Sequence, residues 1–226
     1  MLNSRREHLL RLIVENYIET AEPVGSQFLV EEGSLQVSGA TLRNEMRALE
    51  DDGYLTHPHT SSGRTPTEQG FQYYVVHIMA EIDIDKTIQQ KVQDAVSEGT
   101  DQREQVKCLA KFAAEHLTNA IIVAFNPSSV YYTGISYLFA QPEFRDSSYT
   151  VSISKIFDHC EDRLDEIYDL VNDGQTEVLI GNQNPFGSSC GLVGTRVRDI
   201  IFIVLAPMRM DYGKAVGLLK YINSAK

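Results

Sequence analysis

The 226-residue sequence lacks the features that would place it in a membrane, on a secretory route or in a disulfide-bonded class. No apolar run approaches the roughly 20 residues that a membrane-spanning helix needs, and the N-terminal stretch MLNSRREHLL has no signal-peptide core. Cys108, Cys160 and Cys190 are odd in number and widely spaced, so neither a disulfide framework nor a zinc site is predicted. We therefore expect a cytoplasmic globular protein with buried thiols and no membrane contact.

Motifs of catalysis and cofactor binding are also scarce. The glycines of the segment 187–194 have the spacing of neither common nucleotide-binding loop. The acidic residues between 158 and 166 fit a solvated helix face better than an acid/base pair. His57 and His59 have no carboxylate or cysteine in their segment that would complete a metal site. The sequence thus predicts neither an enzyme nor a bound cofactor or metal.

Positive charge is scarce, but its distribution is uneven. The net charge of −11 argues against a protein that coats nucleic acid, because neutralising phosphates requires clustered Lys and Arg. Residues 33–44 nevertheless contain Arg43 and no acid, and residues 53–67 contain Arg64 and no acid. A local DNA site needs such segments to be free of carboxylates, so this function stays open.

The stretch LQVSGATLRNEMRALEDDGYL, residues 35–55, predicts an amphipathic helix. Leu42, Met46 and Leu49 form one apolar stripe, Ser38 can cap the first turn, and Gly53 can end the helix. Its polar face can enter a major groove, where Arg and Asn bond to guanine and adenine. We predict that this face consists of Ser38, Gly39, Thr41, Arg43, Asn44 and Arg47. An ordinary amphipathic helix remains the alternative for this stretch alone.

The flanking segments predict the rest of a DNA-binding module. Residues 4–20 and 26–30 read as helices, the second capped by Ser26, and Thr67 caps a helix over 68–81. Residues 54–56 and 65–66 flank the polar segment HPHTSSGR, which is typical of a β-hairpin after a recognition helix. The hairpin would contact phosphates or the minor groove through Thr60, Ser61, Ser62, Gly63 and Arg64. Arg5 and Arg6 are either solvated or placed against phosphate.

The remainder predicts a mixed domain. Residues 83–117 show helical periodicity broken near Gly99, and form a helical linker. Strands are expected at 121–125, 130–132, 177–180 and 199–205, and helices at 154–170 and 213–224. Arg209 either pairs with Asp211 at the last strand-to-helix corner or contacts an anion. The predicted fold class is α+β, with a winged helix-turn-helix over 1–80, the linker over 81–119 and an α/β domain over 120–226.

Several of these runs together resemble one family. VENYIETAEPVGSQFL and VSGATLRNEMRALEDDGYLTHPHTSSGRTPTEQGFQYYV, with GISYLFAQPEF, VLIGNQN and APMRMDY farther on, resemble the heat-inducible transcription repressor of the HrcA type. The resemblance implies a winged helix joined to a GAF-like domain, and a dimer bound to an inverted repeat upstream of chaperone genes. It also implies that the GroE chaperonin supports the active state.

The sequence departs from that family in the middle of the C-terminal half. In the family a long segment, including a region that contributes to dimerisation, separates the strand matching 120–125 from the one near Val130. Here only residues 126–129 join them. The α/β domain is therefore expected to be a reduced GAF-like domain.

The resulting prediction is a sequence-specific DNA-binding repressor of heat-shock or chaperone genes that acts on double-stranded DNA. Specificity normally comes from two half-sites, so we expect a homodimer formed through the linker helices or the C-terminal domain. The alternative is a ligand- or protein-sensing interaction module whose winged helix is not primarily a DNA reader. The net charge favours that alternative, and the acid-free segments favour DNA.

Overall fold

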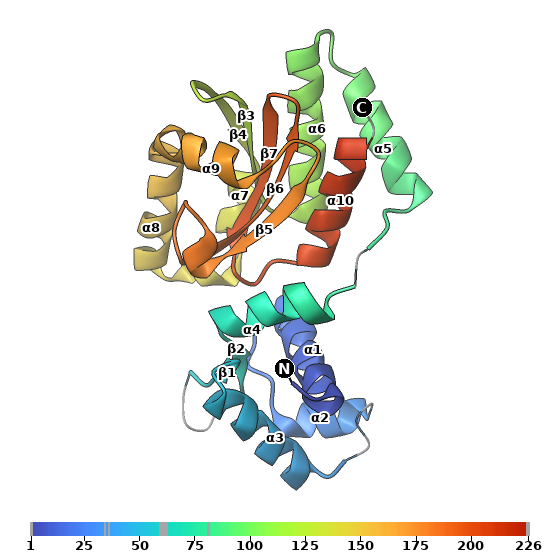
Figure 1. The fold of residues 1–226 in the computed structure, drawn as a ribbon, viewed down its shortest axis with the longest axis vertical. Coiled ribbons are helices and arrows are strands. Elements are labelled where there is room, and N and C mark those ends of the chain that lie inside the picture. The colour runs from blue at the N-terminus through green and yellow to red at the C-terminus, as the bar shows by residue number, and fades with distance from the viewer. Residues whose placement is uncertain (1, 34, 36, 59–62, 81, 225–226) are drawn as a thin grey trace. The chain divides into compact units, whose positions relative to one another are not determined.

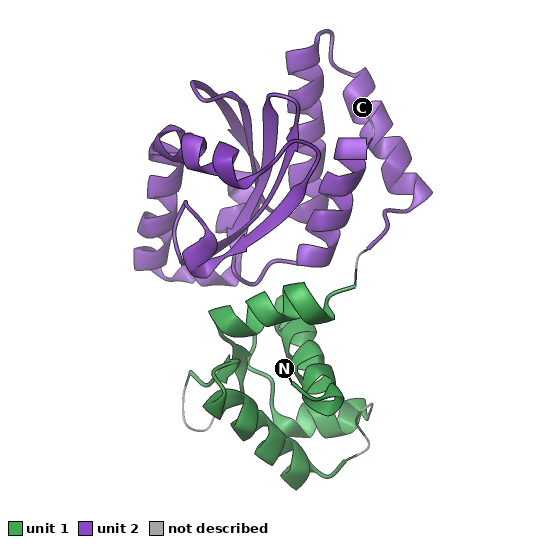
Figure 2. Ribbon diagram, viewed as in Figure 1, with its two compact units in different colours: residues 1–80 green, residues 81–226 purple. Residues whose placement is uncertain are grey.

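The computed structural model describes residues 2–224 except 34, 36, 59–62 and 81. The chain forms two compact units, residues 1–80 and residues 81–226 (Figure 2). Helices and antiparallel strands are mixed along it, so the predicted α+β class is confirmed. Within the described residues, no helix combines the length and the apolar character that crossing a bilayer requires.

Unit 1, residues 1–80, is three helices followed by a short hairpin and a fourth helix (Figure 1). Asn3 caps the first helix by accepting from the backbone N–H of Arg6, and Ala21 ends it at φ +57°. The core collects one face of every helix, including the fully buried Leu9, Ile13 and Leu49. The elements are α1 (Ser4–Thr20), α2 (Ser26–Glu32), α3 (Gly39–Asp51), β1 (Leu55–Thr56), β2 (Thr65–Pro66), α4 (Glu68–Tyr73) and the π-helical turn η1 (Tyr74–Ile78).

The predicted helix over 4–20 and the predicted hairpin are confirmed, with two differences in detail. Gly25, rather than Ser26, is the residue at the N-terminal cap of α2, and it offers no side-chain bond. The helix after Thr67 ends at Ile78, three residues before the predicted limit, after changing from α to π geometry.

A third segment joins the hairpin of unit 1. Val24 and Arg64 exchange two backbone hydrogen bonds, each 2.9 Å long, in an antiparallel bridge. Gly63 permits this approach, because a Cβ there would lie 2.4 Å from the Val24 carbonyl. The sequence gives only a helix break at 22–25, because one bridge residue leaves no periodic pattern.

Unit 2, residues 81–226, is built on a five-stranded antiparallel sheet in the order β4-β3-β7-β6-β5. Residues 126–129 form the tight connection between β3 and β4, and the hairpin has a register shift between Ala124 and Asn126 next to this turn. The central strands β3 and β7 are almost entirely buried. The strands are β3 (Ala120–Asn126), β4 (Ser129–Thr133), β5 (Thr176–Ile180), β6 (Cys190–Val197) and β7 (Ile200–Pro207).

Helices cover both faces of this sheet (Figure 1). α6 (Gln102–Leu117) and α10 (Tyr212–Ser224) lie on one face, where Asn223 donates to Thr195 Oγ1 at 3.0 Å. On the other side lie α8 (Ser147–Asp158) and α9 (Leu164–Leu170), and α7 (Ile135–Phe139) contacts β3. α5 (Lys86–Ser97) packs along α6, so residues predicted as a linker are folded into unit 2.

Two elements of unit 2 differ from the sequence prediction. The expected single helix over 154–170 is wrong, because α8 ends at Asp158 and a short 3₁₀ turn (Glu161–Arg163) precedes α9. Buried Cys160 and Leu164 continue the helical spacing across this break, so periodicity cannot reveal it. Strand β6 was not predicted, since Gly191 and Gly194 interrupt its apolar pattern. Gly191 is required there, because a Cβ would lie 2.3 Å from the Tyr212 hydroxyl.

Candidate nucleic-acid interface

Helix α3 separates a buried stripe from an exposed polar face. Leu42, Met46 and Leu49 are 1%, 4% and 0% exposed. The side chains on the outer face, all exposed, are those of Arg43, Asn44 and Arg47. The helix therefore presents two guanidinium groups and one amide to solvent from a rigidly packed support.

The first turn of α3 is fixed by the predicted cap. Ser38 Oγ accepts from the backbone N–H of Thr41 at 3.2 Å and lies 3.0 Å from Thr41 Oγ1. Arg43 Nε donates to the carbonyl of Gly39 at 3.1 Å, so its side chain lies along the same turn. Gly39 lies beside α2, because a Cβ there would be in ordinary van der Waals contact with Val30 Cγ2 at 3.4 Å. Ser38, Gly39, Thr41 and Arg43 are thus brought together at one helix end.

The arginines of unit 1 differ in their partners. Arg6 Nε lies 2.8 Å from Glu45 and its Nη1 3.3 Å from Asp52, while Arg5 lies 3.8 Å from Glu45. The hydrogen bond that the Arg6 guanidinium donates to Glu45 raises the pKa of Arg6 above its ordinary value. Arg5 and Arg6 are therefore engaged by carboxylates. Among the described residues, neither Arg43 nor Arg47 has an acidic side chain at ion-pair distance.

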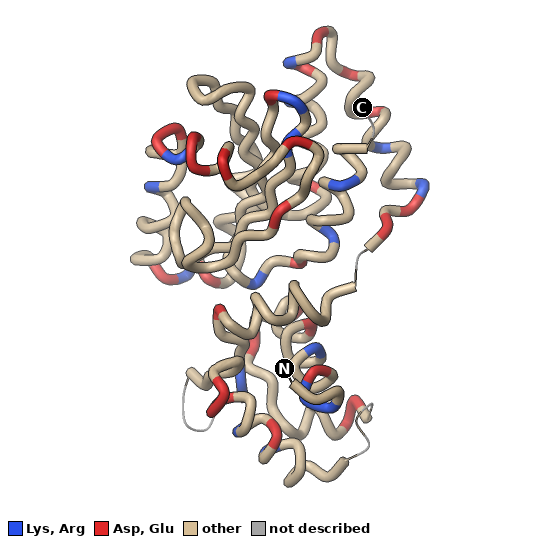
Figure 3. Tube along the Cα trace, viewed as in Figure 1, with Lys and Arg blue, Asp and Glu red and all other residues tan. Residues whose placement is uncertain are grey.

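The hairpin receives a carboxylate that its own sequence lacks. Glu50, from the last turn of α3, lies 2.8 Å from Arg64 Nε and is hydrogen-bonded to His57 Nδ1. Charges of both signs therefore alternate along α3 and reach the hairpin (Figure 3). The carboxylate comes from α3, outside residues 53–67, so the composition of that segment does not reveal the contact. The predicted contacts Thr60, Ser61 and Ser62 lie outside the described residues.

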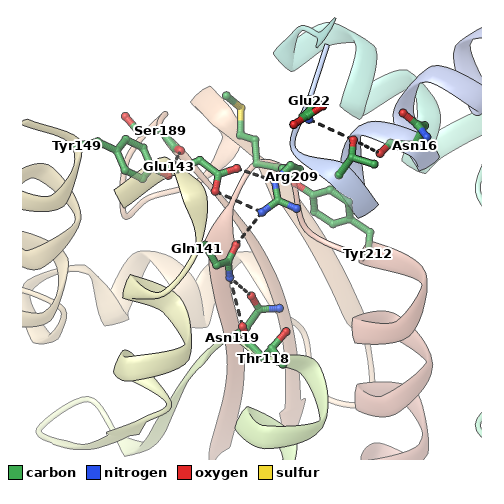
Figure 4. A network of polar contacts seen from close by, with 12 residues as sticks. Asn16, Glu22, Thr118, Asn119, Gln141, Glu143, Tyr149, Ser189, Arg209 and Tyr212 are labelled. Atoms are coloured by element: carbon green, nitrogen blue, oxygen red, sulfur yellow. Dashed lines mark hydrogen bonds and ion pairs between the residues drawn. The ribbon is translucent and has the colours of Figure 1, made fainter. Parts of the chain in front are cut away.

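Arg209 in unit 2 has a partner different from the predicted one (Figure 4). Its Nε lies 2.6 Å from Glu143 Oε1, whereas Asp211 pairs with Lys214 at 3.0 Å. The predicted Arg209–Asp211 pair is wrong, because the side chain turns toward a residue 66 positions away in the sequence. Arg209 is 12% exposed and held by a carboxylate, so nothing favours an anion contact.

Two other polar residues of unit 2, Gln141 and Cys190, are held by their surroundings. Gln141 extends the Arg209 network by donating to Asn119 Oδ1 at 2.8 Å. Burial raises the pKa of Cys190 to about 12, which leaves its thiol protonated and unreactive. Across the part of the chain that the structure describes, no cluster of three His, Cys, Asp or Glu side chains could hold a metal ion.

Comparison with known proteins gives the class. The profile of the family described as "HrcA protein C terminal domain" matches residues 75–216. Proteins named "Heat-inducible transcription repressor HrcA" match from Bifidobacterium longum (39% identity over 128 residues, 57% of this chain and 34% of the relative) and Nocardioides sp. (57% over 75 residues, 33% and 22%). The match spans about a third or less of these relatives' lengths.

A crystal structure described as a hypothetical protein at 2.2 Å resolution shares the fold. Its TM-score is 0.74 at 17% identity, and the match covers 100% of this chain and 97% of that chain. The sequence relatives are named as heat-inducible transcription repressors. The chain belongs to the HrcA family.

Proposed function

We propose that the chain is a sequence-specific DNA-binding repressor of heat-shock or chaperone genes, acting in the cytoplasm, with unit 1 as a winged helix-turn-helix. The observation that carries the proposal is the face of α3, where Arg43 and Arg47 lack acidic partners among the described residues and flank Asn44. α2 and α3 form the helix-turn-helix, and the hairpin after α3 is the wing. The names of the relatives support the repressor role.

In the proposed complex, the residues of unit 1 contact different parts of the DNA. Arg43, Asn44 and Arg47 face base edges in the major groove, where guanidinium and amide groups pair bidentately with guanine and adenine. Ser38, Gly39 and Thr41 bring the helix N-terminus against phosphate, which the helix dipole favours. The wing tip, with Gly63 and Arg64, touches the backbone or the minor groove. The chemistry is recognition alone.

Two copies of unit 1 are needed to read an inverted repeat. One helix and one wing cover little DNA, and repressors gain specificity by placing two recognition helices one helical turn apart. We therefore propose a homodimer held through 81–119 or through the reduced GAF-like domain of 120–226. Support of the active state by the GroE chaperonin is proposed by analogy with the family.

A mobility-shift titration tests the function directly. The full chain is titrated against an inverted-repeat duplex from a chaperone promoter, a single half-site and a scrambled duplex, across a salt series. We expect Arg43→Ala to lose about 1–3 kcal/mol on the repeat with relaxed specificity. Arg163→Ala, on an exposed turn of unit 2, is the matched control and should bind as wild type.

Three outcomes of this titration contradict the proposal in different ways. Equal loss on all duplexes would show that Arg43 contacts only phosphate. Binding of a single half-site as tightly as the inverted repeat would contradict the proposed homodimer. No preference for the repeat over scrambled DNA would favour an interaction module instead, which the net charge of −11 also suits.

A further inference from the structure

One carboxylate, that of Glu50, joins α3 to both ends of the hairpin tip. Glu50 Oε1 is hydrogen-bonded to His57 Nδ1, directly after β1, and Oε2 lies 2.8 Å from Arg64 Nε, directly before β2. The side chains of Glu50 and Arg64 are only 20% and 23% exposed, and that of His57 is 37% exposed. These side chains are partly shielded from water, so solvent screens the attraction between Glu50 and Arg64 less than it screens a fully exposed pair.

The backbone fixes the same point from the other side. Arg64 exchanges two hydrogen bonds of 2.9 Å with Val24, and Gly63 leaves the space that this pairing needs. The bridge holds the main chain of Arg64 but leaves its guanidinium to be oriented separately. Glu50 supplies that orientation and ties it to the final turn of α3.

If only its charge mattered, Glu50 would weaken DNA binding. A carboxylate near a DNA-binding surface repels phosphate, so its removal should tighten binding if it had no other duty. Its contacts predict weaker binding on removal, because an untied hairpin has to be ordered when DNA binds. The sign of the effect therefore separates the two roles.

We propose that Glu50 is a positioning residue for DNA binding, which holds the wing in a fixed relation to the recognition helix through His57 and Arg64. The proposal rests on the proposed function of unit 1. Arg64 then belongs to this tie as well as to the proposed contact of the wing with DNA, and Arg43 and Arg47 carry the contacts of α3.

Glu50→Gln is the test, and Asp51→Asn is its matched control. Asp51 is the next residue of α3, is exposed, and makes no side-chain bond with the described residues. We expect Glu50→Gln to weaken binding to the inverted-repeat duplex by about tenfold, which is about 1.4 kcal/mol. Asp51→Asn should bind equally or up to about threefold more tightly, because it only removes a repulsive charge.

Amide hydrogen exchange of the free protein provides a readout that needs no DNA. Glu50→Gln should speed exchange at Val24 and Arg64 by about tenfold, while Asp51→Asn leaves both rates unchanged. If Glu50→Gln does not fold, His57→Gln releases only one end of the tip and should weaken binding by about threefold. Thermal melting identifies which variants are folded.

The outcomes separate this inference from the proposed function. If the wild-type chain shows no preference for the repeat over scrambled DNA, the proposed sequence-specific DNA binding itself is contradicted. A wild-type preference with equal or tighter binding by folded Glu50→Gln, or with unchanged exchange at Val24 and Arg64, overturns only the role of Glu50. Weaker binding together with faster exchange supports it.

Discussion

The two units differ in how far apart in sequence their important contacts lie. In unit 1 the candidate interface comes from neighbouring elements, α3 and the hairpin, within residues 38–66. In unit 2 the Arg209–Glu143 pair joins residues 66 positions apart, and the sheet places β3 beside β7. The apolar spacing of one helix can be recognised from sequence, whereas a contact between two elements, such as Glu50 with Arg64 or Arg209 with Glu143, cannot.

The units also differ in where their polar groups lie. Unit 1 exposes Arg43 and Arg47 on a helix face, and its carboxylates Glu45 and Glu50 pair instead with arginines of α1 and of the hairpin. Unit 2 has hydrogen-bonded polar groups in its interior, where Asn223 of α10 donates to Thr195 of β6. We infer that charge changes act mainly on binding in unit 1 and on stability in unit 2.

The largest expected effect tests whether the two units are thermodynamically separate. Ile121 is fully buried in β3, between β4 and β7, so Ile121→Ala should cost unit 2 about 2–5 kcal/mol. Val151→Ala, at a side chain 55% exposed on α8, should cost less than about 0.5 kcal/mol. Urea unfolding followed by NMR signals of each unit measures both, and equal loss in unit 1 would contradict separate units.

A smaller effect is expected at the polar network of unit 2. Arg209→Ala leaves the mostly buried Glu143 without its guanidinium, which should cost about 2 kcal/mol. Lys214→Ala removes an exposed pair with Asp211 and should cost less than about 0.5 kcal/mol. The same unfolding assay measures both variants. Similar decreases in the unfolding free energy would show that burial does not make the Arg209–Glu143 pair more stabilising than the exposed pair.

The corresponding change in unit 1 acts on α3. Ser38→Ala removes the cap bond to Thr41 and should destabilise unit 1 by about 1 kcal/mol. Ser26→Ala is the control, because Gly25 occupies the cap of α2, and its cost should stay below about 0.5 kcal/mol. Equal costs would mean that the cap of α3 contributes nothing beyond helix propensity.

The sequence predicts features that lie within one element and not those that depend on contacts between elements. Apolar spacing at Leu42, Met46 and Leu49 predicts α3 correctly, and Ser38 marks its start. The glycine-interrupted strand β6 could not be predicted, since Gly191 is explained only by Tyr212, which lies 21 positions later and packs against it. The Glu50–Arg64 contact cannot be predicted for a similar reason, because it depends on how α3 packs beside the hairpin.

The smallest expected effect is a pH dependence confined to unit 2. Burial, followed by the charges of Lys214 and Lys91, lowers the pKa of His116 below its ordinary 6.5, and Asp85 opposes this shift. As pH falls below about 6.5 the unfolded chain binds a proton more readily than the folded one, so stability decreases.

His116→Gln should therefore flatten the fall in the unfolding free energy of unit 2 between about pH 7 and pH 5. The ring of His116 also stacks on Phe112 at 5.7 Å, so the variant should be slightly less stable at every pH while its pH slope is shallower. Urea unfolding at a series of pH values separates the two effects. An unchanged slope would show that His116 stays as accessible to protons in the folded unit as in the unfolded chain.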